Sequence, residues 1–297
     1  MTRTKRPLGI VTMVYRDYFF LERWYKYYAA QVPPEDLFVF SHGNDPEHHR
    51  IAPGANIINV PRSETMFKFD LRRWRMMSQF ASGMLEFYDW MIVADVDEIM
   101  VVDPVAAPDI VSYIDATYAG KPDGPKNIAP FALELMHVPS EEPLPLAPDA
   151  TILSRRRIFR PSRVYSKPCL IGAPAIFGPG GHRNNLGPRH LSPDLYLLHL
   201  RFCDVDLMKS NAKLRKEIVD QSRVAGQEDS APHPWESLME NYLDGVGNYE
   251  LGGEDVVLKK FRRAMLRQTE KHPGQFIWGP AKNATLYRIP ERFAGVF

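Results

Sequence analysis

Short apolar runs alternate with helical patterns through the first hundred residues, and this alternation most constrains the fold. Residues 8–14 form an apolar, β-branched run that suits a buried strand, and residues 17–30 follow with apolar side chains at helical spacing. Further strands are predicted at residues 37–41, 56–60 and 90–94, and a second helix at residues 69–87. Such alternation is typical of a doubly wound sheet. The sequence therefore predicts an α/β fold whose mostly parallel sheet is flanked by helices.

The second half of the chain is less regular. Residues 139–148 hold four prolines and two glutamates, which predicts a loop. Amphipathic, basic segments predict helices at residues 205–224 and 254–269. We therefore expect one domain over residues 1–205 and a helical C-terminal extension over residues 206–297, packed on the same domain.

Composition excludes several classes of protein. The 37 Lys and Arg residues nearly balance the 36 Asp and Glu residues, so the charge does not favour a nucleic-acid partner. Two cysteines, Cys169 and Cys203, are too few for a disulfide framework, which favours a reducing, cytoplasmic setting. The sequence contains no run of about 20 apolar residues, so no transmembrane segment is predicted. Peripheral contact with a membrane stays open.

An acidic cluster follows the most apolar of the predicted strands. Asp95, Asp97 and Glu98 come directly after residues 90–94, and ligands of parallel sheets bind beyond the carboxyl ends of the strands. Three neighbouring carboxylates repel one another unless a cation neutralises them, and their oxygens suit Mg²⁺ or Mn²⁺. The alternative is an acidic turn in which Asp95 caps backbone amides.

The segment Tyr88–Ile99 resembles the strand and DxD motif of GT-A glycosyltransferases. It is most similar to the family 2-like group, in which DxDE precedes a large apolar residue. Residues 11–28 resemble that group's first strand and helix, with Arg16-Asp17 where most members have Asn-Glu. Residues 167–182 and 197–210 resemble later family segments, so the resemblance spans residues 8 to 215.

The resemblance implies a GT-A-type fold with a Rossmann-like nucleotide-binding half, and a metal-dependent glycosyltransferase. A nucleotide-diphosphate sugar, with UDP-sugars favoured, would be the donor, and a glycan or small molecule the acceptor. Asp95 and Asp97 would hold Mn²⁺ or Mg²⁺, with His182 or His199 completing the site. Contacts to the donor are expected from Thr12, Val14, Asn44, Asp45, Asp95 and Lys167.

Several alternatives remain open at this point. An inverting transferase needs a general base, and the candidates are Glu134, Glu228-Asp229 and Glu254-Asp255. Asn44-Asp45 is equally compatible with a turn before Pro46. A nucleotidyltransferase would carry a glycine-rich loop after its first strand, which residues 14–18 lack. A catalytically degenerate carbohydrate- or nucleotide-binding protein of the same fold is the main alternative function.

Overall fold

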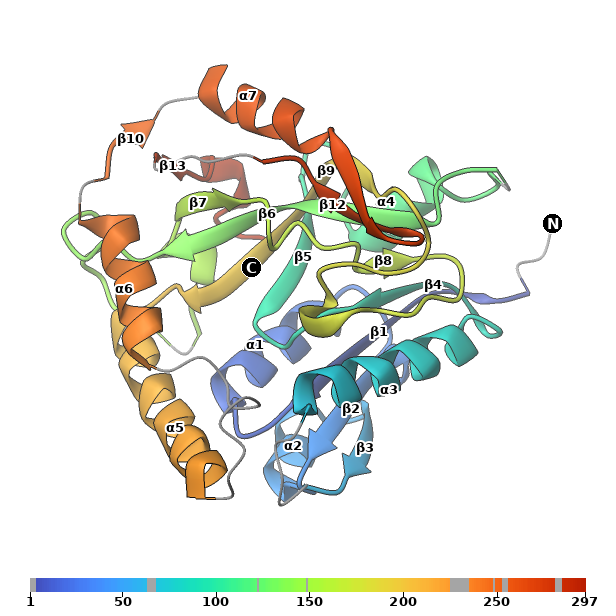
Figure 1. Ribbon diagram of the computed structural model, residues 1–297, viewed down its shortest axis with the longest axis horizontal. Coiled ribbons are helices and arrows are strands. Elements are labelled where there is room, and N and C mark those ends of the chain that lie inside the picture. The colour runs from blue at the N-terminus through green and yellow to red at the C-terminus, as the bar shows by residue number, and fades with distance from the viewer. Residues whose placement is uncertain are drawn as a thin grey trace.

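The structure is a computed structural model, and the part of the chain that it describes is nearly continuous. The described residues are 4–62, 68–121, 123–147, 149–224, 235–247, 249–252, 256–280 and 285–297. Figure 1 shows them arranged around one twisted sheet.

Four parallel strands form one half of this sheet. In spatial order they are β3 (Asn56–Val60), β2 (Leu37–His42), β1 (Arg6–Val14) and β4 (Tyr88–Val93). These are the strands that the sequence predicts, with ends shifted by at most two residues. Because all four run in the same direction, their carboxyl ends meet along one edge of the sheet.

The other half of the sheet is mixed. It contains β5 (Glu98–Val102), β6 (Asn127–Met136), β7 (Ile158–Ser162), β8 (Leu170–Ile171) and β9 (His190–Phe202). The short strand β8 joins the two halves, because it pairs antiparallel with both β4 and β6. Beyond it, β6 runs parallel to β9 and antiparallel to β7, and β9 runs antiparallel to β5. The α/β fold predicted from the sequence is thus confirmed.

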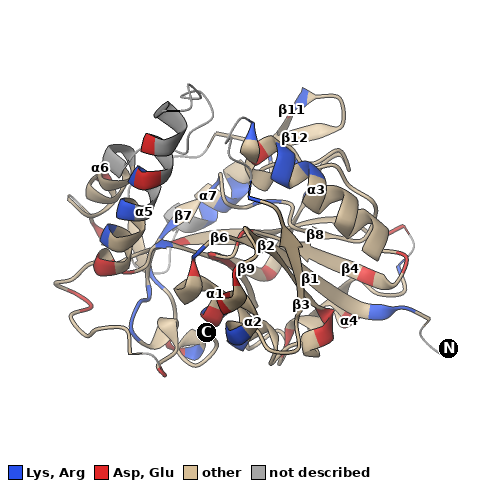
Figure 2. Ribbon diagram, turned by 90° about the horizontal axis from the view of Figure 1, so that it is seen from below, with Lys and Arg blue, Asp and Glu red and all other residues tan. Residues whose placement is uncertain are grey.

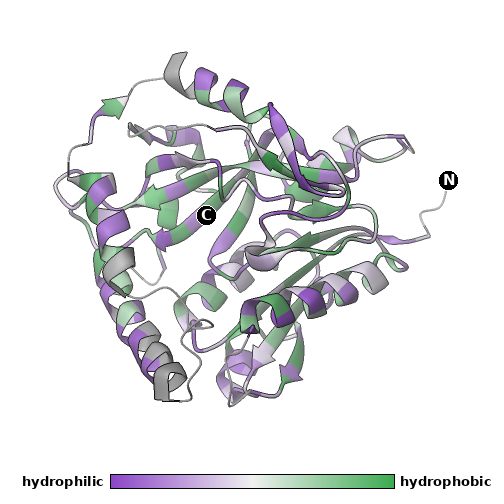
Figure 3. Cartoon of the chain, in the orientation of Figure 1, coloured by the Kyte–Doolittle hydropathy of each residue, from purple (hydrophilic) through white to green (hydrophobic). Residues whose placement is uncertain are grey.

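Helices cover both faces of the parallel half. On one face, α1 (Tyr18–Tyr28) and α4 (Ile110–Thr117) pack against side chains such as Ile10 of β1. On the other, Trp74 and Met77 of α3 (Phe69–Met84) pack against Val11. Neighbouring residues of β1 serve opposite faces because side chains alternate along a strand. Figure 3 shows the resulting hydrophobic strands at the centre.

Smaller elements complete the described chain. Helix α2 (Pro46–Ile51) follows β2, and short 3₁₀ turns occur at Pro34–Asp36, Ile152–Ser154, Pro179–Gly181 and Glu291–Phe293. Basic and acidic residues are interspersed along the outer helices, in keeping with the near-zero net charge (Figure 2). Within the described residues, no helix combines the length and the apolar character needed to cross a membrane.

The C-terminal extension contains the two expected helices, a further helix, α6 (Trp235–Val246), that was not predicted, and also strands. The expected helices are α5 (Val205–Val224) and α7 (Val256–Met265), so the last is shorter than predicted. Strands β10 (Leu251–Gly252) and β13 (Leu286–Arg288) join the main sheet through β7, and β11 (Gln268–His272) pairs with β12 (Gln275–Trp278) as a hairpin. Strands of two or three residues are too short to show an alternating pattern.

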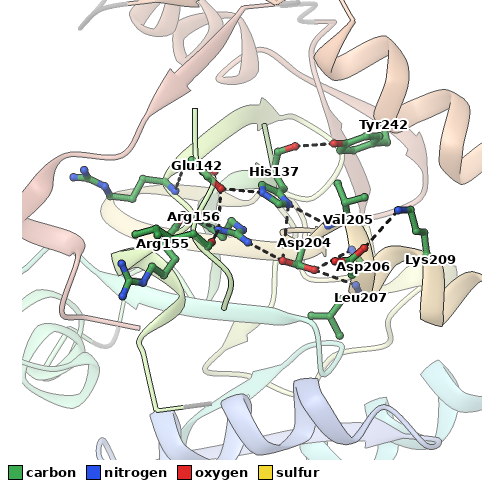
Figure 4. A network of polar contacts seen from close by, with 12 residues as sticks. His137, Glu142, Arg155, Arg156, Asp204, Val205, Asp206, Leu207, Lys209 and Tyr242 are labelled. Atoms are coloured by element: carbon green, nitrogen blue, oxygen red, sulfur yellow. Dashed lines mark hydrogen bonds and ion pairs between the residues drawn. The ribbon is translucent and has the colours of Figure 1, made fainter. Parts of the chain in front are cut away.

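A buried polar network anchors this extension to the sheet (Figure 4). Arg156, only 2% exposed, donates to Asp204 Oδ2 at 2.8 Å and to the Leu144 carbonyl oxygen at 2.7 Å. Asp204 in turn accepts from the first backbone amides of α5. On α6, the Tyr242 hydroxyl donates to the carbonyl oxygen of His137 at 2.8 Å. The network therefore links the proline-rich loop and both helices to the end of β6.

Removing the Tyr242 hydroxyl should measurably weaken this anchor. Tyr242→Phe leaves the buried His137 carbonyl without its donor, and we expect the free energy of unfolding to fall by about 1 kcal/mol. The matched control is Tyr249→Phe, whose hydroxyl donates to the exposed Glu141 and whose loss should change stability by less than about 0.5 kcal/mol. Urea denaturation of both variants checks the difference, and equal effects would contradict it.

Candidate active site

The acidic turn lies between β4 and β5, at the carboxyl edge of the parallel strands. Strand β4 ends at Val93, and Glu98 begins β5. The Glu98 amide donates to the Asp95 carbonyl oxygen at 3.0 Å, and the Asp95 amide donates to Glu98 Oε2 at 3.4 Å. Glu98 is only 1% exposed. One of the three carboxylates, that of Glu98, thus helps to shape the turn itself.

Two side-chain cations compensate these carboxylates. Lys167 Nζ lies 2.5 Å from Glu98 Oε1 and 3.4 Å from Asp95 Oδ2. Arg73 of α3 donates to Asp95 Oδ1 at 2.5 Å and is itself held by Asp70 at 2.9 Å. Both oxygens of Asp95 are therefore engaged by cations of the chain.

The charges in this cluster set the protonation of Asp95. Burial alone would raise the pKa of Asp95, but Arg73 and Lys167 outweigh burial and hold that pKa well below its ordinary value. Burial likewise acts to lower the pKa of Lys167, yet Glu98 and Asp95 raise it overall. Asp95 is therefore a carboxylate and Lys167 an ammonium group at neutral pH.

A second row of polar side chains begins at Asp97. Asp97 Oδ2 lies 3.7 Å from Nε2 of His199, whose Nδ1 lies 3.2 Å from Glu134 Oε1. Glu134 Oε2 accepts from Arg160 at 2.6 Å, and the Tyr165 ring stacks on the imidazole with centroids 3.7 Å apart. His199 is thus held from two sides, with one nitrogen facing Asp97.

Strand register explains why these side chains meet. His199 of β9 is the direct partner of Glu98 on β5 and of Glu134 on β6. Directly opposed residues on neighbouring strands project to the same face of a sheet. The family resemblance singles out His199, whereas its pairing with Glu134 depends on a register that only the folded sheet defines.

Glu134 is poorly suited to act as a general base. Burial would raise its pKa, but His199 and Arg160 lower it to about 2. An efficient base has a pKa near the working pH, because it must both take and release a proton. The contacts of Glu134 instead fit the orientation of His199. The other base candidates, Glu228-Asp229 and Glu254-Asp255, lie outside the described residues.

The residues expected to bind a metal ion are only partly brought together. Among the described residues, no three His, Cys, Asp or Glu side chains converge as a metal-binding group. Asp95 is occupied by cations, and His182 Nδ1 lies 3.1 Å from the Val164 carbonyl oxygen. Asp97 and His199 do face each other. This pair offers two ligand types for an ion, a carboxylate oxygen and an imidazole nitrogen.

The residues expected to contact the nucleotide lie at or near the ends of β1 and β2. Thr12 and Val14 are 0% and 2% exposed, so their side chains belong to the sheet interior. Asp45 accepts from the Glu47 amide at 3.0 Å and so caps α2, and Asn44 adopts a positive φ of 55° beside it. These contacts are the ones that the turn interpretation of Asn44-Asp45 requires.

Aromatic and basic side chains at the same edge were missed by the sequence analysis. His42, which ends β2, stacks on Phe69 with ring centroids 4.7 Å apart. The Arg62 guanidinium lies 3.8 Å from the ring centroid of Tyr15, just after β1. Burial and the charge of Arg62 lower the pKa of His42 to about 4, so its ring is neutral at pH 7. No motif links these residues, which come from four separate segments.

The loop at Pro179–Gly181 packs against Trp74, whose ring lies next to the cations Lys167 and Arg73. Gly181, in the loop at Pro179–Gly181, has a φ of 66° and packs against the ring of the fully buried Trp74. That ring lies 5.6 Å from Lys167 Nζ and 5.3 Å from the Arg73 guanidinium. A Cβ at Gly181 would press into the Trp74 ring, so this close approach requires glycine.

Gly181→Ala should therefore destabilise the protein. The positive φ and the contact with Trp74 together are expected to lower the free energy of unfolding by about 2–4 kcal/mol. Gly83→Ala is the matched control, because Gly83 lies in α3 with open space where the methyl group would go. The control should raise stability by up to about 1 kcal/mol. Thermal unfolding measures the melting temperature of both variants. A shift of both melting temperatures in the same direction would contradict this account.

Comparisons with known proteins add little to this geometry. No family model matches the chain, and no curated protein matches it. A search of solved structures finds mannose-1-phosphate geranyltransferase from Thermus thermophilus, at 12% sequence identity and a TM-score of 0.29. The match covers 79% of this chain and 67% of that chain. A likeness at this TM-score supports no argument about function.

Proposed function

We propose that this protein is a glycosyltransferase that moves a sugar from a nucleotide-diphosphate donor to a hydroxyl group of an acceptor. The observation that carries the proposal is a row of side chains that begins at Asp97, at the carboxyl edge of the parallel strands. It runs through His199 and Glu134 to Arg160 in the mixed half of the sheet. The DxDE resemblance implies donor binding at this turn. Parallel sheets bind nucleotides at this edge in general, which agrees with that implication.

Asp97 and His199 are the residues we assign to a divalent ion, Mn²⁺ or Mg²⁺. Such an ion supplies positive charge next to the departing diphosphate. His199 offers Nε2 while its Nδ1 contacts Glu134 at 3.2 Å, an arrangement that fixes the tautomer and the ring orientation of histidine ligands. Glu134 is accordingly a positioning residue in this proposal, rather than the general base.

Arg73 and Lys167 have a different role in the proposal. They neutralise Asp95 and Glu98, so the turn keeps its shape without a bound ion. Asp97 differs from the other two carboxylates of the DxDE segment. Among the described residues, no lysine or arginine lies within ion-pair distance of Asp97, and its one neighbour of this kind is His199. The Asp97 carboxylate is therefore available to bind the divalent ion of the donor site.

The nucleotide is assigned to the ends of β1 and β2. There the partly exposed Phe69, backed by the buried and neutral His42 ring, and the Tyr15–Arg62 pair offer aromatic surfaces and a guanidinium group. Aromatic faces and arginine stack well on nucleobases, and arginine also suits phosphate. UDP-sugars are the donors that we expect to bind.

Calorimetric titration of UDP and GDP, each with and without Mn²⁺, tests this proposal. We expect one of the two nucleotides to bind only when Mn²⁺ is present. If neither nucleotide binds under any metal condition, the donor site is refuted. A catalytically degenerate carbohydrate-binding protein of the same fold would then be the better explanation.

A further inference from the structure

A cleft of about 570 Å³ opens beside the mixed half of the sheet. Its walls come from β6, β7, β9, α6 and α7, which lie on the opposite side of the molecule from β2 and α3 (Figure 1). Glu134 and Tyr165, the two residues that hold His199, belong to the lining. The cleft therefore reaches the candidate active site from the side opposite the nucleotide.

The lining is rich in arginine. Its charged residues are Glu134, Arg160, Arg163, Arg201 and Asp244. The Glu134 carboxylate is already engaged by Arg160 and His199, and Asp244 is exposed on α6. Among the described residues, neither of the other two arginines has a carboxylate within ion-pair distance, although the nearby Asp97 and Glu134 favour the charge of Arg201.

Arg201 is the arginine of the described lining that has an unpaired buried donor. It follows His199 by two residues on β9, and its Nε atom is buried without a hydrogen-bond partner among the described residues. Its guanidinium carbon lies 5.7 Å from the centroid of the Tyr165 ring. Arg163 donates to the Trp278 carbonyl oxygen over a long distance of 3.4 Å.

Buried guanidinium groups are stabilised by anions that accept their hydrogen bonds. A polar group left unpaired in a low-dielectric site is unfavourable, and a carboxylate or phosphate removes that penalty through paired, charge-assisted bonds. Arginine is the side chain best shaped for such anions. A neutral hydroxyl group would satisfy fewer of the available donors.

We propose that this cleft is the acceptor subsite and that Arg201, assisted by Arg163, binds an anionic group of the acceptor, a carboxylate or a phosphate ester. The assignment of this cleft to the acceptor rests on the proposed function, whereas the binding of an anion by Arg201 does not. The donor diphosphate is assigned elsewhere, because Asp97, Arg73 and Lys167 lie on the β4 and α3 side of His199. Helices α6 and α7 would thereby select the acceptor.

Ligand-observed NMR with D-glucuronate, D-glucose 6-phosphate and neutral D-glucose tests the anion site, without nucleotide or metal. We expect at least one of the two anionic sugars to bind roughly tenfold or more tightly than glucose. Arg201→Gln should weaken that binding about 10- to 100-fold, and Arg163→Gln should weaken it less. The matched control is Arg50→Gln, on an exposed arginine of α2 outside the cleft, which should bind like the unmodified protein.

The same variants separate the acceptor from the donor. UDP binding with Mn²⁺ should be unchanged in Arg201→Gln if the arginine serves the acceptor. A loss of UDP binding with unchanged binding of the anionic sugars would overturn the proposal, and so would equal binding of glucose and both anions. Arg201-dependent binding of an anionic sugar by a protein that binds no nucleotide would refute the proposed function while supporting the anion site.

Discussion

Asp97→Asn is expected to abolish Mn²⁺-dependent nucleotide binding and to reduce turnover by on the order of 100-fold or more. The substitution preserves the size of the side chain and removes its charge. Asp97 is partly exposed, and its carboxylate faces Nε2 of His199 at 3.7 Å. We therefore expect a loss of charge for the ion and the diphosphate with little change in the fold. The measurement is calorimetric titration of UDP or GDP with Mn²⁺.

Two further variants sharpen this prediction. Glu134→Gln keeps a group that can contact His199 and should cost about 10- to 100-fold in metal-dependent binding, as expected for a residue that orients a ligand. Asp115→Asn on α4 makes the same chemical change away from the cluster and should have no effect. Full Mn²⁺-dependent binding by Asp97→Asn would refute the assignment of Asp97.

Lys167→Met is expected to lower the free energy of unfolding by about 3–5 kcal/mol. Lys167 and Glu98 are 2% and 1% exposed and lie 2.5 Å apart. Methionine fills a similar volume, so the main effect is a Glu98 carboxylate left in a buried site without its partner. Burial raises the pKa of Glu98, so part of the loss should appear as proton uptake by this side chain. Urea denaturation measures the loss.

Two comparisons test whether burial of charge causes the loss. Lys26→Met removes a lysine from a pair of nearly equal length, 2.6 Å to Glu22, on the exposed face of α1. That change should cost no more than about 0.5 kcal/mol. The double variant Lys167→Met with Glu98→Gln should recover much of the stability lost by Lys167→Met alone. If the double variant is no more stable than the single one, packing rather than charge explains the loss.

The parallel half of the sheet could be predicted because its signals are local. Each of its strands is a short apolar run, and residues 8–14 and 56–60 are found as strands with almost the same limits. The later strands depend on partners distant in sequence. Strand β13, of three residues, is defined by its pairing with β7 and β10 and carries no periodicity of its own. Strands β10 and β13 were missed for this reason.

The candidate site could be predicted in part for the same reason. The acidic cluster is continuous in sequence, and its place after a buried strand follows from the apolar run before it. Its cations are not continuous with it: Arg73 and Lys167 lie 22 and 72 positions from Asp95. Before folding, Arg73 is one of several basic residues on a helix. Only the packing of α3 beside β4 identifies it as the partner of Asp95.

Release of nucleoside diphosphate from a donor is the most direct test of the central claim. The protein would be incubated with a panel of UDP-sugars and GDP-sugars, with and without Mn²⁺, and the products followed by phosphorus NMR. We predict slow, Mn²⁺-dependent release of UDP or GDP from at least one donor, absent in Asp97→Asn and retained in Asp115→Asn. Release from no donor, or equal release by Asp97→Asn, would contradict the assignment of this protein as a glycosyltransferase acting through Asp97.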